Sequence, residues 1–119
     1  MTAYLFSKDE IAYFAKEYGV SAADELCGDA GEAVGTLLAK GIVKRTAEGY
    51  VIDKLVSFLF KKMISAKRYE RCTIEGSVYC YQCDELIIAL LNDIRKNDSV
   101  CVIPFKNEKE LDEWLAEIG

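Results

Sequence analysis

The chain has 119 residues, of which 51% are hydrophobic, and its formal net charge is −5. This length and apolar content are those of one globular domain with its own core, and we expect a single domain over residues 1–119. No window approaches the ~20 apolar residues that a membrane-spanning helix requires. The first ten residues, MTAYLFSKDE, lack the basic and apolar parts of a signal peptide. We therefore expect a cytoplasmic protein without membrane association.

Charge is distributed unevenly along the chain. Residues 40–71 carry nine basic and three acidic side chains, a net charge of +6, whereas residues 1–39 and 72–119 carry −5 and −6. The acidic outer segments oppose binding to a nucleic acid backbone, while the basic middle segment favours phosphates or an acidic protein surface. Charge alone leaves both kinds of partner open.

The beginning of the chain carries the signals of an amphipathic helix. Ser7 and Glu10 have the spacing of a capping box, which predicts a helix from about Lys8. Gly19 is placed to end this helix with a left-handed residue. Apolar side chains recur at helical spacing between these two points, so one face of the helix should belong to the core.

Two further helices are predicted before residue 41. A short helix over 22–27 follows a serine that can cap it. Asp29 and Glu32 repeat the capping-box spacing, and the helix that they begin should end at Gly41.

The stretch 40–64 reads as a helix end, a basic hairpin and an apolar helix. The β-type runs 42–43 and 50–52 flank a turn, and Asp53 can cap the helix that follows. This order of elements is typical of a winged helix-turn-helix. The apolar side chains of the last helix cover more than one of its faces, which predicts burial on two sides, either between the two halves of the chain or in a homodimer interface: Leu55, Val56, Phe58, Leu59, Phe60, Met63 and Ile64.

From residue 67 the composition becomes β-type. Residues 68–74 and 77–83 are predicted to form a hairpin, and 100–105 a further strand. Residues 86–91 are apolar throughout and fit a central strand or, alternatively, part of a buried helix; we favour the strand. Asn107 can cap a terminal helix that should lie across the sheet.

The fold class predicted from these elements is α+β. Residues 1–66 should form a winged-helix-like helical lobe, and residues 67–119 an antiparallel β-meander packed with the C-terminal helix.

The five cysteines offer one short motif, Cys80-Tyr-Gln-Cys83. A redox motif needs such a pair at a helix N-terminus, but this one falls in a predicted strand. A zinc site would have to add Cys72 and Cys101, without a second CxxC and without histidine. Positions 80 and 83 of a strand also point to opposite faces. We therefore expect reduced cysteines that pack as small apolar residues, with no metal and no cofactor.

Catalytic signatures are missing from the sequence. The chain contains no histidine, which removes Ser-His-Asp, Cys-His and His-metal arrangements. The adjacent acidic pairs are best explained as solvated charge at the ends of elements, so no general acid and base can be assigned. We expect a protein that is not an enzyme.

Tyr79 and Tyr81 lie two residues apart and should share one face of a strand. Such a pair resembles the stacking platform of a single-strand RNA binder. The neighbouring side chains Glu75, Asp84 and Glu85 are acidic, however, so packing beneath the final helix is the better explanation.

Three segments of the chain, YLFSKDEIAYFAKEYGV, LLAKGIVKRTAEGYVID and FKNEKELDEWLAEI, resemble in their order the secretion-associated chaperones of type VII (ESX) systems and their relatives in Gram-positive bacteria. The resemblance implies binding of a secreted helical substrate through the sheet and its flanking loops. The chain is about half as long as these proteins, and self-association as a homodimer would supply the other half.

The first functional hypothesis is thus a non-enzymatic protein-binding adaptor or chaperone. It is favoured by the acidic outer segments, the two-sided apolar helix and the exposed edges of an open meander. The candidate partner-binding residues lie on the basic hairpin, the apolar helix and the predicted sheet: Lys44, Arg45, Phe58, Phe60, Met63, Tyr79 and Tyr81.

The alternative hypothesis is a DNA-binding winged-helix regulator. Lys44 and Arg45 would contact phosphates, and the helix before Gly41 would enter the major groove. That helix offers Asp29, Glu32 and Thr36 but no Arg, Asn or Gln to read base edges. Nucleic acid is therefore the less favoured partner.

Overall fold

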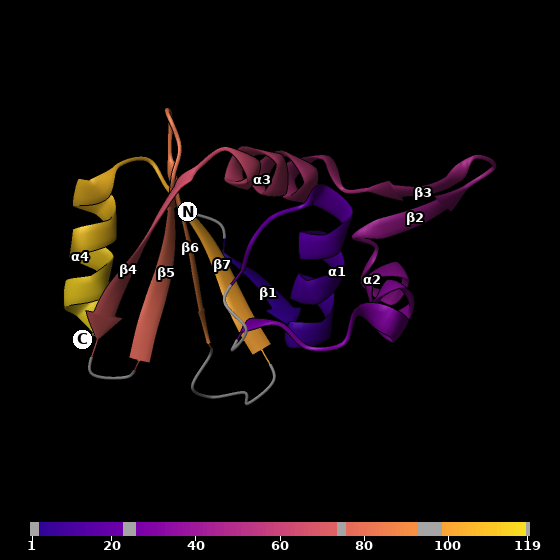
Figure 1. Ribbon diagram of the computed structural model, residues 1–119, viewed down its shortest axis with the longest axis horizontal. Helices are drawn as coiled ribbons and strands as arrows, with labels where there is room; N and C mark the ends of the chain where they lie inside the picture. The colour runs from indigo at the N-terminus through magenta and orange to yellow at the C-terminus, as the bar shows by residue number, and fades with distance from the viewer. Residues whose placement is uncertain (1–2, 23–25, 74–75, 93–98, 119) are drawn as a thin grey trace.

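The computed structural model describes residues 3–22, 26–73, 76–92 and 99–118 (Figure 1). The fold class is α+β, as predicted. Along the chain the elements are β1 (Tyr4–Ser7), α1 (Lys8–Tyr18), the 3₁₀ helix η2 (Ala30–Glu32), α2 (Ala33–Lys40), β2 (Val43–Thr46), β3 (Gly49–Ile52), α3 (Lys54–Ile64), β4 (Lys67–Thr73), β5 (Gly76–Gln82), β6 (Ile87–Asn92), β7 (Ser99–Phe105) and α4 (Glu108–Ile118).

Five strands form an antiparallel sheet in the order β1-β7-β6-β5-β4. The predicted meander is confirmed, and the segment predicted over 86–91 forms a strand rather than a helix, with the bounds Ile87–Asn92. The edge strand β1 was not predicted. It has four residues and pairs with β7 from Tyr4↔Val102 to Ser7↔Ser99, so its existence depends on a partner about 95 positions away and not on a local pattern.

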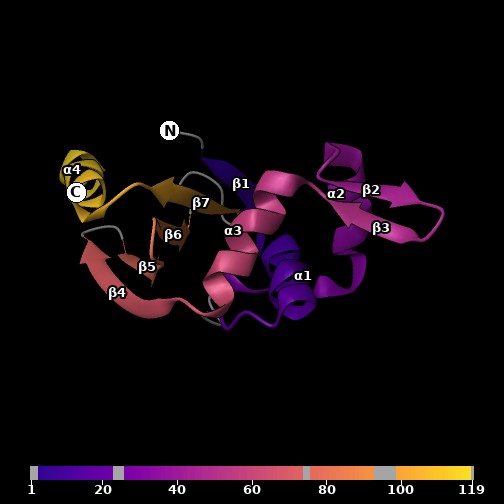
Figure 2. The same ribbon diagram turned by 90° about the horizontal axis from the view of Figure 1, so that it is seen from above.

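The sheet separates two apolar clusters. One face packs against α1, α2 and α3, and the other against α4 (Figure 2). The prediction that α4 lies across the sheet is confirmed, since Leu111 is fully buried there and the rings of Phe105 and Trp114 lie 5.6 Å apart. A sheet covered on both faces accounts for the uninterrupted apolar run of β6.

Tyr79 and Tyr81 do not pack beneath α4, and that prediction was wrong. Both side chains face the N-terminal helices, because Val78 and Cys80 occupy the α4 side of the alternating strand β5. The hydroxyl of Tyr81 donates a hydrogen bond of 2.7 Å to the carbonyl oxygen of Ser21. The two tyrosines therefore tie the sheet to the first half of the chain.

The helix α3 is buried on one side and not on two. Asp53 caps it as predicted, accepting hydrogen bonds from the amides of Leu55 and Val56. One stripe of the helix enters the core, whereas Leu55 is 63% exposed and Phe58 42% exposed. The prediction of two-sided burial was wrong. The sheet and the N-terminal helices pack against the same side of α3, and only the residues on that side are buried: Val56, Leu59, Phe60 and Met63.

The predicted basic hairpin is present as β2 and β3, which form a separate sheet of two strands. It projects from the body of the molecule at the end opposite α4 (Figure 1). Its base is fixed by a hydrogen bond of 2.7 Å from the Asp53 amide to the Ile42 carbonyl oxygen. The turn uses Gly49 at φ 132°, a conformation that residues with a side chain rarely adopt.

The helix before Gly41 begins as 3₁₀ rather than α-helix. Asp29 caps it by accepting a hydrogen bond from the Gly31 amide, and the α-helical part runs from residue 33. The short helix predicted over 22–27 includes residues 23–25, which lie outside the described residues.

Glu10 is a buried carboxylate that joins three elements. The predicted capping box is present, with the Ser7 amide donating to Glu10 Oε1 at 2.8 Å and the Glu10 amide to Ser7 Oγ at 3.1 Å. From α2, Thr36 Oγ1 donates to Glu10 Oε2 at 2.7 Å, and Lys40 Nζ lies 2.6 Å from Oε1. The side chain is 1% exposed. Burial by itself would raise the pKa of Glu10, but the hydrogen bonds from Lys40, Ser7 and Thr36 outweigh it and hold the pKa below its ordinary value.

Replacing Glu10 with Gln should therefore destabilise the fold. The amide keeps the shape of the side chain but loses the charge that Lys40 and the Ser7 amide recognise, and we expect a loss of about 2 kcal/mol in the free energy of unfolding at neutral pH. Urea denaturation followed by circular dichroism measures it. Glu17→Gln, an exposed position on the same helix, is the control and should change stability little.

The difference between wild type and Glu10→Gln should also depend on pH. Because the folded pKa of Glu10 is depressed, its stabilisation is complete above the unfolded pKa and is lost as the pH falls through the folded value. The difference in stability should begin to shrink near the ordinary Glu pKa of about 4.3 and disappear below the folded pKa of Glu10. A difference that is constant from neutral to acidic pH would contradict this account of Glu10.

Candidate functional site

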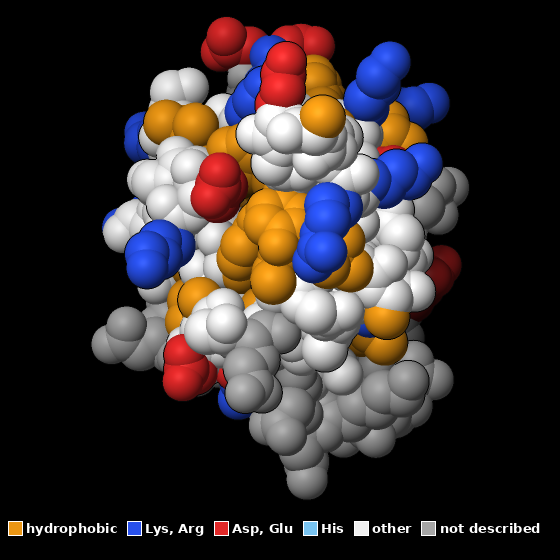
Figure 3. All heavy atoms as spheres, turned by 90° about the vertical axis from the view of Figure 1, so that its right-hand side faces the viewer, with side chains coloured by type: hydrophobic (Ala, Val, Ile, Leu, Met, Phe, Trp, Pro, Cys, Tyr) orange, Lys and Arg blue, Asp and Glu red, His pale blue; other side chains and the backbone are white. Residues whose placement is uncertain are grey.

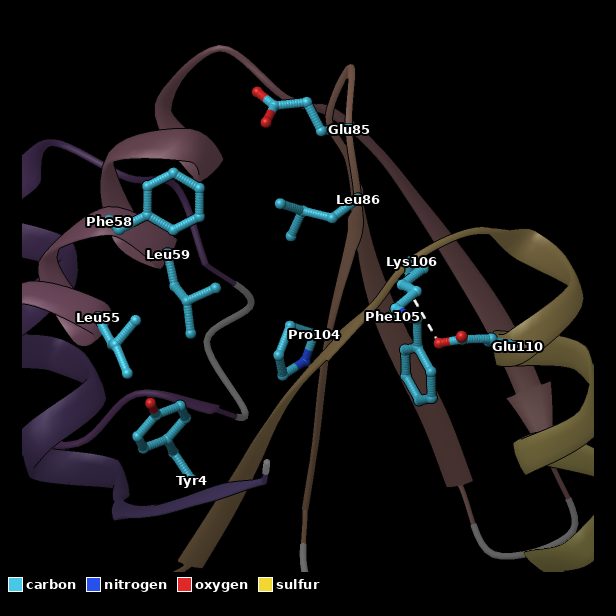
Figure 4. A pocket seen from close by; sticks show the side chains of 10 residues that line it. All are labelled: Tyr4, Leu55, Phe58, Leu59, Glu85, Leu86, Pro104, Phe105, Lys106 and Glu110. Carbon is cyan, nitrogen blue, oxygen red and sulfur yellow. Dashed lines mark hydrogen bonds between the residues drawn. The ribbon is translucent and has the colours of Figure 1, made fainter. Parts of the chain in front are cut away.

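A groove of about 610 Å³ runs between α3 and the end of the sheet (Figure 4). It is predominantly apolar, with charged side chains at its rim. The residues that line it come from both halves of the chain: Tyr4, Leu55, Phe58, Leu59, Glu85, Leu86, Pro104, Phe105, Lys106 and Glu110.

The α3 wall of the groove is the flank of the helix that the core leaves bare. Leu55, Phe58 and Leu59 recur at spacings of three and four residues, which places them along one side of the helix. Leu59 is buried at the bottom, while Leu55 and Phe58 reach solvent. Large apolar side chains that stay exposed beside a hollow mark an interaction surface.

The opposite wall is formed by the ends of strands. Leu86 and Pro104 are half-buried there, and Tyr4 stands at the lower end of the groove in Figure 4. The Tyr4 ring stacks on Phe6 with centroids 6.2 Å apart. Burial and the nearby carboxylate of Asp53 raise the pKa of Tyr4, so its hydroxyl remains a neutral donor.

Pro104 lies on a part of β7 that β1 does not reach. The described pairing of β1 with β7 ends at Val102, and among the described residues the strand neighbour of Pro104 is Ile88 of β6. Proline lacks the amide hydrogen that a ladder requires, and within sheets it is confined to strand ends, bulges and sheet edges. A strand added at this edge would lose a hydrogen bond, so the groove is better suited to side chains than to a further strand.

Glu85 lies at one end of the groove and pairs with Lys62 of α3. Their side chains form an ion pair of 2.6 Å between α3 and the segment before β6. The Lys62 ammonium also lies 5.5 Å from the centroid of the Phe58 ring. The hydrogen bond with Glu85 raises the pKa of Lys62, which keeps the lysine charged. On the sheet side, the Lys106 amide donates to Glu110 Oε1 at 3.1 Å.

The structure separates the residues that the sequence proposed for partner binding. Phe60, Met63 and Tyr81 are buried and cannot meet a partner while the chain holds this fold. Tyr79 is half-buried against the N-terminal helices. Phe58 lines the groove, with neighbours that the sequence did not single out.

Lys44 and Arg45 are exposed on the hairpin, at a distance from the groove. Arg45 lies over the Tyr50 ring at 5.8 Å, and Val51 beside it is 54% exposed. Figure 3, which views this end of the molecule, shows apolar side chains with Lys and Arg as well as Asp and Glu side chains around them. Tyr50 also lines a second hollow, of about 680 Å³, against α1 and η2. The residues that line this hollow include both Lys16 and the acidic Glu17 and Asp29, so its charge does not favour one class of ligand.

The basic segment 40–71 does not form one surface. Lys40 pairs with Glu10 inside the N-terminal lobe, whereas Arg71 pairs with Asp112 of α4 at 2.8 Å. In Figure 1, β4 and α4 lie at one end of the molecule, and α2 and the hairpin lie at the other. The net charge of +6 on residues 40–71 is therefore divided among several parts of the molecule.

Comparison with known proteins finds no matching family model, no matching curated protein and no matching solved structure.

The cysteines do not converge on a site. Cys80 faces α4, and Cys83 packs with the cluster on the other side of the sheet. Burial raises the pKa of both thiols, which keeps them protonated and unreactive. Within the described ranges, no group of three or more His, Cys, Asp or Glu side chains is placed to hold a metal ion. None of the helices there has the length and apolar character needed to span a bilayer.

Two phenylalanines of α3 offer a direct test of this arrangement. Phe58→Ala should cost less than about 1 kcal/mol of unfolding free energy, because its ring is partly in water. Phe60→Ala should cost about 3–5 kcal/mol, because it empties a site in contact with Phe14. Thermal and urea denaturation measure both. Equal losses would mean that α3 is covered on both sides after all.

Proposed function

We propose that this protein is a non-enzymatic adaptor or chaperone of the cytoplasm that binds the apolar face of a helix from a partner protein in the α3 groove. The observation that carries the proposal is the pair Leu55 and Phe58, exposed beside the half-buried Leu86 and Pro104. Burying these side chains in a complex would stabilise it by about 25 cal/mol per Å² of apolar surface, before the cost of association.

A helix is the favoured occupant over a strand. An added strand needs an open edge with alternating amide and carbonyl groups, and Pro104 removes an amide at the edge beside the groove. A helix needs an apolar groove that takes side chains at i, i+3 and i+4, which the spacing of Leu55, Phe58 and Leu59 matches on the receiving side.

The resemblance to type VII secretion-associated chaperones supports a secreted helical protein as the partner class. Those proteins bind such substrates through the sheet and its flanking segments, and the groove lies where α3 meets the sheet. The proposal as a binding module does not depend on this resemblance.

A DNA-binding regulator is the second candidate, favoured by the exposed Lys44 and Arg45 on a projecting hairpin. Against it stand the dispersal of the other basic residues and the acidic Asp29 that caps the helix before the hairpin. Micromolar binding of random duplex DNA that weakens steeply with salt and is lost in a Lys44→Gln/Arg45→Gln variant would establish it in place of the groove proposal.

The groove proposal predicts a partner that depends on two side chains. The tagged wild-type chain, purified from the cells in which it is native, should retain a stoichiometric protein with an amphipathic helix. Leu55→Asp/Phe58→Asp should weaken that complex at least about tenfold, because it places two charges in the apolar contact. Calorimetric titration of the purified pair measures the change.

Val51→Asp is the matched control, since it alters an apolar side chain of similar exposure on the hairpin. It should leave the affinity unchanged. A complex that survives Leu55→Asp/Phe58→Asp and is lost in Val51→Asp would place the binding site on the hairpin and contradict the proposal.

A further inference from the structure

The strand β4 forms a long edge of the five-stranded sheet. It has seven residues, and among the described residues its only strand neighbour is β5. In Figure 2 it lies at the border of the sheet, on the far side from β1. The other edge strand, β1, has four residues. A long edge with unpaired amide and carbonyl groups is a template for a further strand.

The backbone groups that point away from β5 belong to alternate residues of β4. The Cys83 amide donates to the Leu86 carbonyl oxygen at 2.9 Å and continues the ladder between β5 and β6, so the odd-numbered residues of β5 bond to β6. The even-numbered residues of β5 then bond to β4. Their partners in β4 are Lys67, Tyr69, Arg71 and Thr73. The amide and carbonyl groups of Arg68, Glu70 and Cys72 therefore face the edge.

Two of these edge residues carry opposite charges on the same face of the sheet. Arg68 and Glu70 are both exposed on the side away from α4, because they alternate with Tyr69, which packs in the cluster beneath α4. Arg68 Nη1 donates to the Ser21 carbonyl oxygen at 3.0 Å, and Ser77 Oγ donates to Glu70 Oε1. Among the described residues, neither has an opposite charge at ion-pair distance. The edge thus presents one positive and one negative charge, two positions apart.

Protection against aggregation does not explain this pair of charges. Charged side chains, lysine above all, keep foreign strands away from a sheet edge. Charges of both signs repel only those strands whose charges do not match, so they select a partner instead of excluding every partner.

We propose that two copies of this chain pair through β4 in antiparallel orientation, with a twofold axis at Tyr69. Arg68 of each copy then lies directly opposite Glu70 of the other copy, and the two residues exchange backbone hydrogen bonds because both face the edge. Opposite charges at directly paired positions stabilise antiparallel strands. Tyr69 meets its own counterpart on the α4 side as an aromatic cross-strand pair. The contact joins two five-stranded sheets into one.

The charges select this register over its neighbours. A shift of two residues in either direction sets Glu70 against Glu70 or Arg68 against Arg68, and like charges at paired positions are destabilising. A shift of one residue sets groups that face the edge against groups that face β5. The proposed register places Lys67 opposite Arg71, but Asp112 of the same chain binds Arg71 at 2.8 Å and offsets its charge.

This contact is separate from the α3 groove. None of the residues that line the groove belongs to β4. The inference therefore goes beyond the proposed function and does not depend on it.

Sedimentation velocity of the full chain should show a dimer whose fraction grows with concentration across the micromolar range. Arg68→Glu and Glu70→Arg should each raise the dimer dissociation constant at least about tenfold, because each sets like charges at both paired positions. An equimolar mixture of the two variants should recover the dimer. One variant then carries two negative charges on its edge, and the other carries two positive charges.

Lys44→Glu, at an exposed position on the hairpin, is the control and should leave the dimer intact. Circular dichroism checks the fold of Arg68→Glu, which also loses the hydrogen bond to Ser21, whereas Glu70→Arg leaves that bond in place. A monomeric wild type, or a mixture of the two variants that stays monomeric, would overturn the inference and leave the groove proposal standing. A dimer that survives both charge reversals would also overturn it, and loss of that dimer in Leu55→Asp/Phe58→Asp would place the contact at the groove.

Discussion

The carboxylate of Glu10 joins the elements on which the groove depends. It caps the junction between β1 and α1 and accepts hydrogen bonds from α2, so that the edge of the sheet and two helices share one buried charge. With α1 held in this way, Phe14 stacks against Phe60 of α3 at 4.7 Å. That contact directs one side of α3 into the core and turns Phe58 outward. The groove therefore depends on the contact between Phe14 and Phe60, which are not among the residues that line it.

Local signals in the sequence predicted most of the elements, because caps, glycine stops and β-type runs act over a few residues. Ser7 with Glu10, Asp53 and the alternation of β5 are examples that the structure bears out. Two features were beyond such signals. The strand β1 is too short to be recognised without its partner β7. The apolar pattern of α3 shows which of its residues favour burial. Which of them are buried depends on the positions of the sheet and α1, and the pattern does not contain that information.

Of the residues that line the groove, the sequence had singled out only Phe58 as a partner-binding candidate. Its neighbours Leu86 and Pro104 come from segments that are distant in sequence, and no spacing rule connects them. The basic segment was recognisable by composition, yet its side chains are divided between internal ion pairs and exposed positions. Composition determines how much charge there is, whereas the fold determines which charges meet a partner.

The measurement that tests the central claim most directly is hydroxyl-radical footprinting of the free chain, read by mass spectrometry. The account predicts modification of Leu55 and Phe58 and protection of Phe60 and Met63, although methionine is by its chemistry among the residues most easily oxidised. Rapid oxidation of Met63, or protection of Phe58 in the monomeric chain, would contradict it. Either result would mean that α3 does not expose one apolar flank beside the sheet.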